Sequence, residues 1–271
     1  MKQMDLFTIN REIAYIGQFG LQRKKFCSDY IDRKYKTLDV MSQAWQKQAR
    51  VKGERITCTK GCFFCCLLNV EATIQECEAI VYYLYQNEDA LKSFLTKYPL
   101  WRNRIRENGD MFKELGELSR EVFSFQFGHK EIGEDYILRK QEAFSEAQAR
   151  YAGQNIYCPF LDDRLCTIYP VRPYNCAGFY ATTPSAWCDP SNQHEPKIYR
   201  SKLPGEAILD LTFHHKSLRA PVFTFMPLAV YEILSGGYGY LSTIPGFENL
   251  EREFMKDPEV RSYLDAYAQS R

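Results

Sequence analysis

The sequence lacks a long apolar run and lacks an excess of either charge. No hydrophobic stretch approaches the roughly 20 residues that a membrane-spanning helix needs, and the mean hydropathy is −0.43. The 35 basic and 34 acidic residues leave a formal net charge of +1, so no global field draws the chain to nucleic acid or anionic lipid. Residues 1–15 contain no apolar signal-peptide core and no small-residue cleavage site. We therefore expect a cytoplasmic protein without nucleic-acid or membrane partners.

Repeats, low-complexity linkers and familiar catalytic arrangements are also missing. No Ser-His-Asp arrangement and no convincing carboxylate pair stands out among the 271 residues, so no catalytic residue is predicted. Hydrophobic residues make up 45% and charged residues 25% of the chain, which is ordinary globular composition. We predict one mainly α-helical domain over residues 1–271, with an irregular cysteine-rich metal-binding core formed by residues 58–66 and 156–188 and one short β-hairpin.

Helical periodicity covers the N-terminal 50 residues, where one apolar stripe comprises Ile31, Tyr35, Leu38, Met41 and Trp45. The basic run at residues 23–25 is interpreted as a solvated helix face. Residues 73–76 read as a capping box that opens another helix. The buried stripe of that helix includes Cys77 and ends at Leu84, which places Cys77 in the core and away from any metal. Pro99 is expected to break the helical pattern.

The second half of the chain carries several turn and cap signals. Residues 162–164 separate two short apolar runs and predict a tight hairpin. After position 188 the chain is expected to be loop-like to about residue 220. Pro227 predicts the start of a helix that Gly236 and Gly237 end. Residues 257–258 are typical of a helix start, with a buried face at Val260, Tyr263, Leu264 and Tyr267.

What the sequence does contain is an unusual set of ten cysteines, eight of them in two groups. The clustered cysteines are Cys58, Cys62, Cys65 and Cys66 in the first group, and Cys158, Cys166, Cys176 and Cys188 in the second. Core cysteines would be scattered, and a reducing cytosol disfavours structural disulfides. Crowded thiols in an intracellular chain are more often metal ligands or redox groups, so all eight are candidate metal ligands.

Local features of both groups suit a metal. Spacers of two or three residues let a turn bring two thiolates onto one ion, and Phe63 and Phe64 would shield the sulfurs from water. Since neighbouring side chains usually point apart, we expect one of Cys65 and Cys66 to bind the local metal and the other to serve a second site. Arg172 lies between Pro170 and Pro173. It is a candidate cofactor-binding residue, whose guanidinium would hydrogen-bond thiolate sulfur or an anionic ligand.

The pairing of CTKGCFFCC with CPFLDDRLCTIYPVRPYNC resembles the CxxCxxCC, or YkgJ-type, cysteine-cluster family of zinc- or iron-chelating domains. Flagellin lysine N-methylases belong to that family. The resemblance implies metal binding by the eight clustered cysteines, with Cys188 as the eighth. It implies an S-adenosylmethionine-dependent methylation of a protein lysine only weakly. This sequence departs from the pattern because three residues, not two, separate Cys58 from Cys62.

Three function classes stay open at this point. The first is a metal-binding protein whose cofactor is an iron–sulfur cluster, of the [4Fe–4S] type, ahead of zinc. The second is an S-adenosylmethionine enzyme that modifies a protein substrate, either a methylase or a radical enzyme, because C-x3-C-x2-C is also the radical signature. Residues 51–57 are a poor strand for the barrel that a radical enzyme needs. The third is a structural zinc module used for protein interaction. His194 could replace a cysteine in a mixed zinc site.

Overall fold

The computed structural model describes residues 3–59, 61–127, 133–200, 207 and 223–270. These residues form ten α-helices and three two-stranded antiparallel sheets, which confirms the mainly helical prediction. The α-helices are α1 (Gln3–Ile13), α2 (Gly17–Val51), α3 (Ile74–Gln86), α4 (Glu88–Glu107), α5 (Gly109–Phe127), α6 (Glu134–Gly153), α7 (Tyr174–Ala177), α9 (Met226–Leu241), α10 (Leu250–Met255) and α11 (Pro258–Gln269). The short 3-10 helices are η1 (Phe64–Leu67), η2 (Tyr169–Val171) and η3 (Ser185–Cys188). The strand pairs are β1 (Glu71–Thr73) with β6 (Phe223–Phe225), β2 (Leu161–Asp162) with β3 (Leu165–Cys166), and β4 (Phe179–Ala181) with β5 (Ile198–Arg200).

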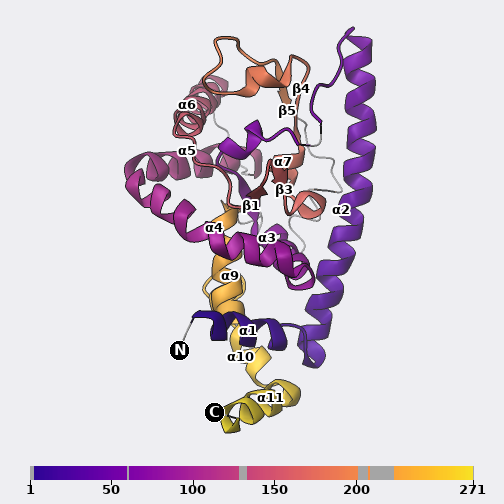
Figure 1. Cartoon of the computed structure of the whole chain (residues 1–271), viewed down its shortest axis with the longest axis vertical. Helices are drawn as coiled ribbons and strands as arrows, with labels where there is room; N and C mark the ends of the chain where they lie inside the picture. Colours follow the sequence, from indigo (N-terminus) through magenta and orange to yellow (C-terminus); the bar gives the residue numbers. More distant parts are fainter. Residues whose placement is uncertain (1–2, 60, 128–132, 201–206, 208–222, 271) are drawn as a thin grey trace.

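Helix α2 forms one side of the molecule (Figure 1). Its 35 residues make a rod roughly 52 Å long at 1.5 Å per residue. Helices α5 and α6 pack together on the opposite side, and α9 runs from the middle toward the end where α1, α10 and α11 lie. The cysteine-bearing segments therefore lie between a long helix and a helical pair. None of the described helices is long and apolar enough to cross a membrane.

Helix α3 is the centre of the hydrophobic core. The predicted capping box at Thr73 is present in full, because the Thr73 hydroxyl accepts from the Glu76 N–H at 3.2 Å and the Glu76 carboxylate accepts from the Thr73 N–H at 3.0 Å. The predicted stripe from Ile74 to Leu84 is buried, Cys77 included. Helix α3 packs against α9 on one side and α2 on another, so its burial fixes the long helix against the core.

The buried face of α2 agrees with the predicted stripe in part, because Met41 is buried and Ile31, Leu38 and Trp45 pack against the core. Tyr35 is 48% exposed, whereas its neighbour Lys34 is 2% exposed. The face that packs inward carries Arg23, Cys27 and Tyr30 as well. The basic run was interpreted as solvated, and for Arg23 that was wrong. Two cations occupy core positions of this helix because carboxylates on α3 meet them there.

Proline and glycine act differently from the prediction in two helices. Pro99 lies inside α4 and does not break it. The ring sits on the exposed side, while Phe94, Tyr98 and Trp101 bury the other face and keep the helix in place. Helix α9 begins at Met226–Pro227 as expected, but Gly237 kinks it instead of ending it, with φ 51° and ψ −134° that favour glycine.

The predicted hairpin is present as β2 and β3, with Leu161 opposite Cys166. Its two turn residues, Asp163 and Arg164, both have positive φ (42° and 62°), which is the backbone of a two-residue type I′ turn. Residues 198–200 pair with β4 and are not loop. Asp257 caps α11 as predicted, but only Val260 on the expected face is fully buried.

Candidate metal centre

Backbone hydrogen bonds join the two cysteine groups. The Cys158 N–H donates to the Cys66 carbonyl at 2.8 Å, which ties the start of the second segment to the end of the first. Thr57 donates from its N–H to the Ala181 carbonyl at 2.9 Å, and the Ala181 N–H points back to the Cys58 sulfur at 3.2 Å. Segments about 90 residues apart in the chain are thus adjacent, as a shared metal core requires.

Six of the eight candidate cysteines line one cavity of about 80 Å³. The lining cysteines are Cys62, Cys65, Cys66, Cys158, Cys166 and Cys176. They come from residues 61–66, from the β2–β3 hairpin and its flanks, and from the short helix α7. Arg164 and Arg172 line the same cavity. The fold therefore gathers soft sulfur donors and two guanidinium groups around one space, a donor set that suits zinc or iron.

Cys58 and Cys188 lie outside the lining of this cavity and beside its edge. The thiols that interact electrostatically with Cys188 are those of Cys58, Cys62 and Cys65, and η3, which carries Cys188, contacts η1. All ten cysteines are free thiols. As the side chains stand, no three Cys, His, Asp or Glu residues in the described part of the chain converge tightly enough to enclose an ion. A metal would have to draw the sulfurs inward by side-chain rotation.

The vicinal pair is electrostatically asymmetric. A hydrogen bond from the Cys66 thiol and the nearby Arg172 guanidinium together lower the pKa of Cys65 to about 7, against the effect of burial. The same hydrogen bond, together with burial and the neighbouring Cys158 thiol, raises the pKa of Cys66. In the metal-free protein Cys65 therefore loses its proton at a lower pH than Cys66 does.

Burial raises the pKa of the remaining thiols. It raises the pKa of Cys158 to about 12 and of Cys188 to about 11, with further increases from neighbouring cysteines. The pKa of Cys176 is also raised, and Arg172 opposes that shift. Such thiols gain charge only when a cation replaces the proton, so metal binding would release protons.

The predicted place of Arg172 was over the second cysteine group. Its guanidinium carbon lies 4.1 Å from the centroid of the Tyr169 ring, and the side chain lines the thiol cavity. Arg164, which the sequence analysis missed, stacks over Phe63 at 5.0 Å. The sequence placed Arg164 only in the turn of the predicted hairpin, which carries no signal for the cavity it lines. His194 stacks on Trp187 at 4.5 Å and is exposed; His214 and His215 lie outside the described residues.

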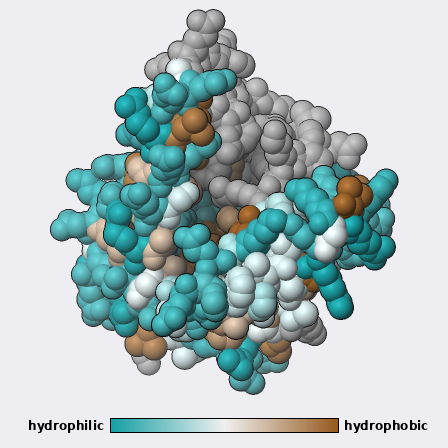
Figure 2. Space-filling model, turned by 90° about the horizontal axis from the view of Figure 1, so that it is seen from above, coloured by the Kyte–Doolittle hydropathy of each residue, from teal (hydrophilic) through white to brown (hydrophobic). Residues whose placement is uncertain are grey.

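Aromatic rings pack together within and beside the first cysteine segment. Phe63 and Phe64 stack on each other at 4.9 Å, and Phe63 contacts Tyr157 at 6.0 Å. Figure 2 views the molecule from the end where β4 and β5 lie, and the described surface there is mostly hydrophilic with hydrophobic residues in small separate spots. The rings do not close the segment off from solvent, because Cys58 and Cys65 are exposed.

The described sheets and helices give no support to the radical-enzyme alternative. A radical S-adenosylmethionine enzyme places its three-cysteine motif after the first strand of a β/α barrel. In the described residues, 51–57 form no strand and every sheet is a two-stranded antiparallel pair. The glycines at 236–239 lie within α9 and do not follow a strand. Neither the barrel nor a glycine-rich nucleotide turn supports that class.

A helical fold in which thiols from separate segments surround one cavity defines a cysteine-rich metal-binding protein. A family model matches the chain and agrees with this class. The family is CxxCxxCC, described as "Putative zinc- or iron-chelating domain", and its model covers residues 57–197. The match spans slightly more than half of the chain and includes all eight clustered cysteines, and the chain belongs to this family. No curated protein and no solved structure matches the chain with significance. A zinc or iron cofactor follows from the family.

Proposed function

We propose that the chain holds two metal centres, each on four cysteine thiolates. The observation that carries this proposal is the cavity lined by six thiols from separate segments. The electrostatic neighbours suggest how the eight cysteines divide. Cys188 interacts with Cys58, Cys62 and Cys65, whereas Cys176 and Cys66 each interact with Cys158, Cys166 and Cys65. Cys65 is a neighbour of both sets, and we assign it to the set of Cys188 so that each centre has four thiolates. Four-coordinate sulfur sites match both zinc and iron–sulfur chemistry.

In this assignment the vicinal pair is split between the two centres. Centre one comprises Cys58, Cys62, Cys65 and Cys188, and centre two comprises Cys66, Cys158, Cys166 and Cys176. Each centre draws ligands from both cysteine groups of the sequence. The backbone bond between Cys158 and Cys66 supports the crossing arrangement, since it brings a residue of the second group beside the last residue of the first.

We propose iron–sulfur clusters as the occupants. Aromatic rings at Phe63, Phe64 and Tyr157 pack together at the first segment, and the surroundings of such clusters tune their potential. When bound, the clusters would supply one-electron chemistry. The chain's own residues hold the sulfurs and place Arg172 near the thiols, where its charge opposes the negative charge of the site.

Anaerobic purification followed by metal and acid-labile sulfide analysis tests this function. We expect iron together with sulfide, and a visible absorption band that bleaches on reduction. Zinc without sulfide would overturn the choice of iron while leaving thiolate centres in place. A protein that binds neither metal, before or after reconstitution, would overturn the function itself.

Single substitutions test the division into two centres. Cys188→Ala removes a ligand of centre one only, and Cys176→Ala removes a ligand of centre two only. Each variant should retain about half of the metal, because four-coordinate thiolate sites lose their ion when one ligand is removed. If either substitution empties both centres while the protein stays folded, the eight cysteines form one site.

A further inference from the structure

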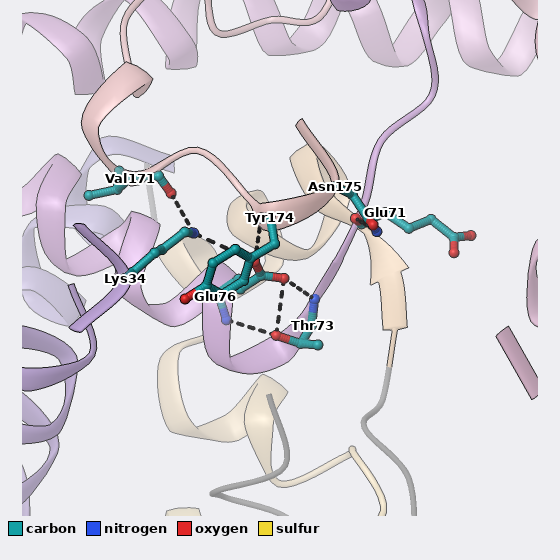
Figure 3. A network of polar contacts seen from close by, with 7 residues as sticks. All are labelled: Lys34, Glu71, Thr73, Glu76, Val171, Tyr174 and Asn175. Atoms are coloured by element: carbon teal, nitrogen blue, oxygen red, sulfur yellow. Dashed lines mark hydrogen bonds and ion pairs between the residues drawn. The ribbon is translucent and has the colours of Figure 1, made fainter. Parts of the chain in front are cut away.

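A buried ion pair connects the long helix α2 to the second cysteine segment. Lys34 on α2 and Glu76 on α3 each have side chains that are 2% exposed, and the Lys34 ammonium lies 3.5 Å from the Glu76 carboxylate. Figure 3 shows both side chains pointing into the space between α2, α3 and the segment that carries Val171 and Tyr174. Nothing in the sequence analysis assigned a role to Lys34.

The Glu76 carboxylate holds two backbone segments at once. One oxygen accepts from the N–H and the hydroxyl of Thr73, at 3.0 and 3.3 Å, and completes the cap of α3. The other oxygen accepts from the Tyr174 N–H at 2.8 Å, at the first residue of the helix that contains Cys176. Because the first N–H groups of a helix have no intrahelical partner, this carboxylate also fixes the start of α7.

Lys34 holds the residues just before α7. Its ammonium donates to the Val171 carbonyl at 3.3 Å and lies 5.0 Å from the centroid of the Tyr174 ring. Val171 and Tyr174 bracket Arg172, and Cys176 follows two residues later in α7. The Cys176 thiol is close enough to interact electrostatically with Lys34. The pair therefore contacts both ends of the stretch that presents Arg172 and Cys176 to the cavity.

Stability of the core does not require such a pair. Removing two charges from water is costly, and well-packed apolar residues in their place are often as stable or more stable. Groups that orient metal ligands from behind are the better-attested use of buried polar contacts beside a metal site. The hydrogen bonds to Val171 and Tyr174 are of that kind, since they act on the backbone that carries a proposed ligand.

We propose that Lys34 and Glu76 form a positioning pair for centre two, fixing residues 171–176 so that Cys176 and Arg172 face the other thiols, and that metal loading in turn rigidifies α2 through this pair. The inference rests on the proposed function, because it presumes a metal on Cys176. It makes α2 part of the metal site, although no candidate ligand lies on that helix.

The Arg23–Glu78 ion pair provides a matched control. It also joins α2 to α3 and is buried, with side chains that are 8% exposed. Arg23 lies eleven residues before Lys34 on the same helix, roughly 16 Å away along its axis. If the only role of these ion pairs is to stabilise the packing of α2 on α3, removing either pair should have the same effect on metal retention. If Lys34 and Glu76 position the metal ligands, only their removal should speed metal loss.

The test compares Lys34→Met and the double variant Lys34→Met/Glu76→Met with Arg23→Met, each purified with its metal. Metal loss to excess EDTA is followed by elemental analysis, and backbone hydrogen exchange is measured for residues 171–176 and for α2. We expect the half-time of metal loss to be shorter by roughly tenfold or more in both Lys34 variants, since losing a supporting contact commonly weakens a metal site by that factor. Exchange should rise at residues 171–176, and α2 should lose the protection that metal gives it in the unsubstituted protein. Arg23→Met should lose metal at the unsubstituted rate.

The double variant keeps the inference testable if Lys34→Met fails to fold, because it leaves no buried unpaired charge. Should the folded double variant retain metal as the unsubstituted protein does, the positioning role is wrong. Equal acceleration by Arg23→Met would likewise overturn it, since the effect would then be general to α2 packing. An unsubstituted protein that holds no metal would instead refute the proposed function, so the two failures are distinct.

Discussion

At the scale of single residues, the asymmetry of Cys65 and Cys66 gives a pH-dependent prediction for the metal-free protein. Alkylation of Cys65 by iodoacetamide should increase as the pH rises through about 7, because its pKa is lowered to that value by the Cys66 hydrogen bond and by Arg172. Only the thiolate reacts. Arg172→Ala removes the cation and should move the curve to higher pH, while Arg172→Lys should move it less.

Peptide mass spectrometry across a pH series measures both curves. Cys66 serves as the internal control, because its raised pKa keeps it a thiol over the same range. The prediction is wrong if the midpoint of Cys65 alkylation lies near the ordinary thiol pKa of about 8.5 and does not change in Arg172→Ala. Cys66 and Arg172 would then not be lowering the pKa of Cys65.

The two cysteines outside the groups give a second residue-scale prediction. Cys27 and Cys77 are 1% and 0% exposed and pack in the core. Alanine at either position should leave the metal content unchanged and lower the free energy of unfolding by about 1 kcal/mol through lost packing. Metal analysis and urea unfolding measure the two effects, with Cys176→Ala as the variant that loses metal. Metal loss from either core variant would show that the ligand set is wrong.

At the scale of elements, Pro99 in α4 is the feature that sequence rules mispredicted. A proline in a helix interior lacks the N–H for one backbone bond, a cost of up to ~3 kcal/mol. Because Pro99 is exposed and the opposite face is buried, Pro99→Ala should restore a bond to the Leu95 carbonyl without disturbing packing. We expect the free energy of unfolding to rise by about 1–3 kcal/mol in urea denaturation. No increase would mean that the surrounding core had already fully compensated for the missing bond.

Elements with local signals were the ones that the sequence could predict. The capping box at Thr73, the Asp257 cap and the turn at Asp163 are encoded within a few residues, and each is present. The apolar part of the buried face of α2 was predictable from periodicity, but its buried cations were not. Lys34 is buried because Glu76, Val171 and Tyr174 meet it from other parts of the chain, and periodicity treats a lysine as solvated. Contacts with distant parts of the chain, and not helix periodicity, therefore determine which polar residues of α2 are buried.

In the candidate site, too, the features with a local sequence signal were predicted and those set by tertiary contacts were not. Clustering and the family resemblance picked out the eight cysteines, and the cavity places six of them together with Arg172. The proposed division of ligands between two centres draws on the structure, because Cys188 interacts electrostatically with Cys58 and Cys62 despite its distance from them in the chain. Arg164 needed it too, since an exposed turn residue gives no sign of which cavity it lines.

At the scale of the whole molecule, the metal should act as a structural crosslink. The two cysteine groups are separated by α3, α4, α5 and α6, so a metal shared between them closes a loop of roughly 90 residues. Among the described residues, the Cys158–Cys66 and Thr57–Ala181 backbone bonds join these segments. Ligands that bind only the folded state stabilise it by mass action.

Removing the metal with a chelator should therefore lower the melting temperature of the entire protein. The transition should stay cooperative, since residues 160, 168 and 171 on the cysteine segments belong to the same core as α3 and α9. Differential scanning calorimetry of metal-loaded, stripped and reloaded protein measures the shift, and reloading controls for irreversible damage. A stripped protein of verified metal content that melts at the original temperature would show that the cysteine core folds without its metal and that the thiols serve chemistry alone.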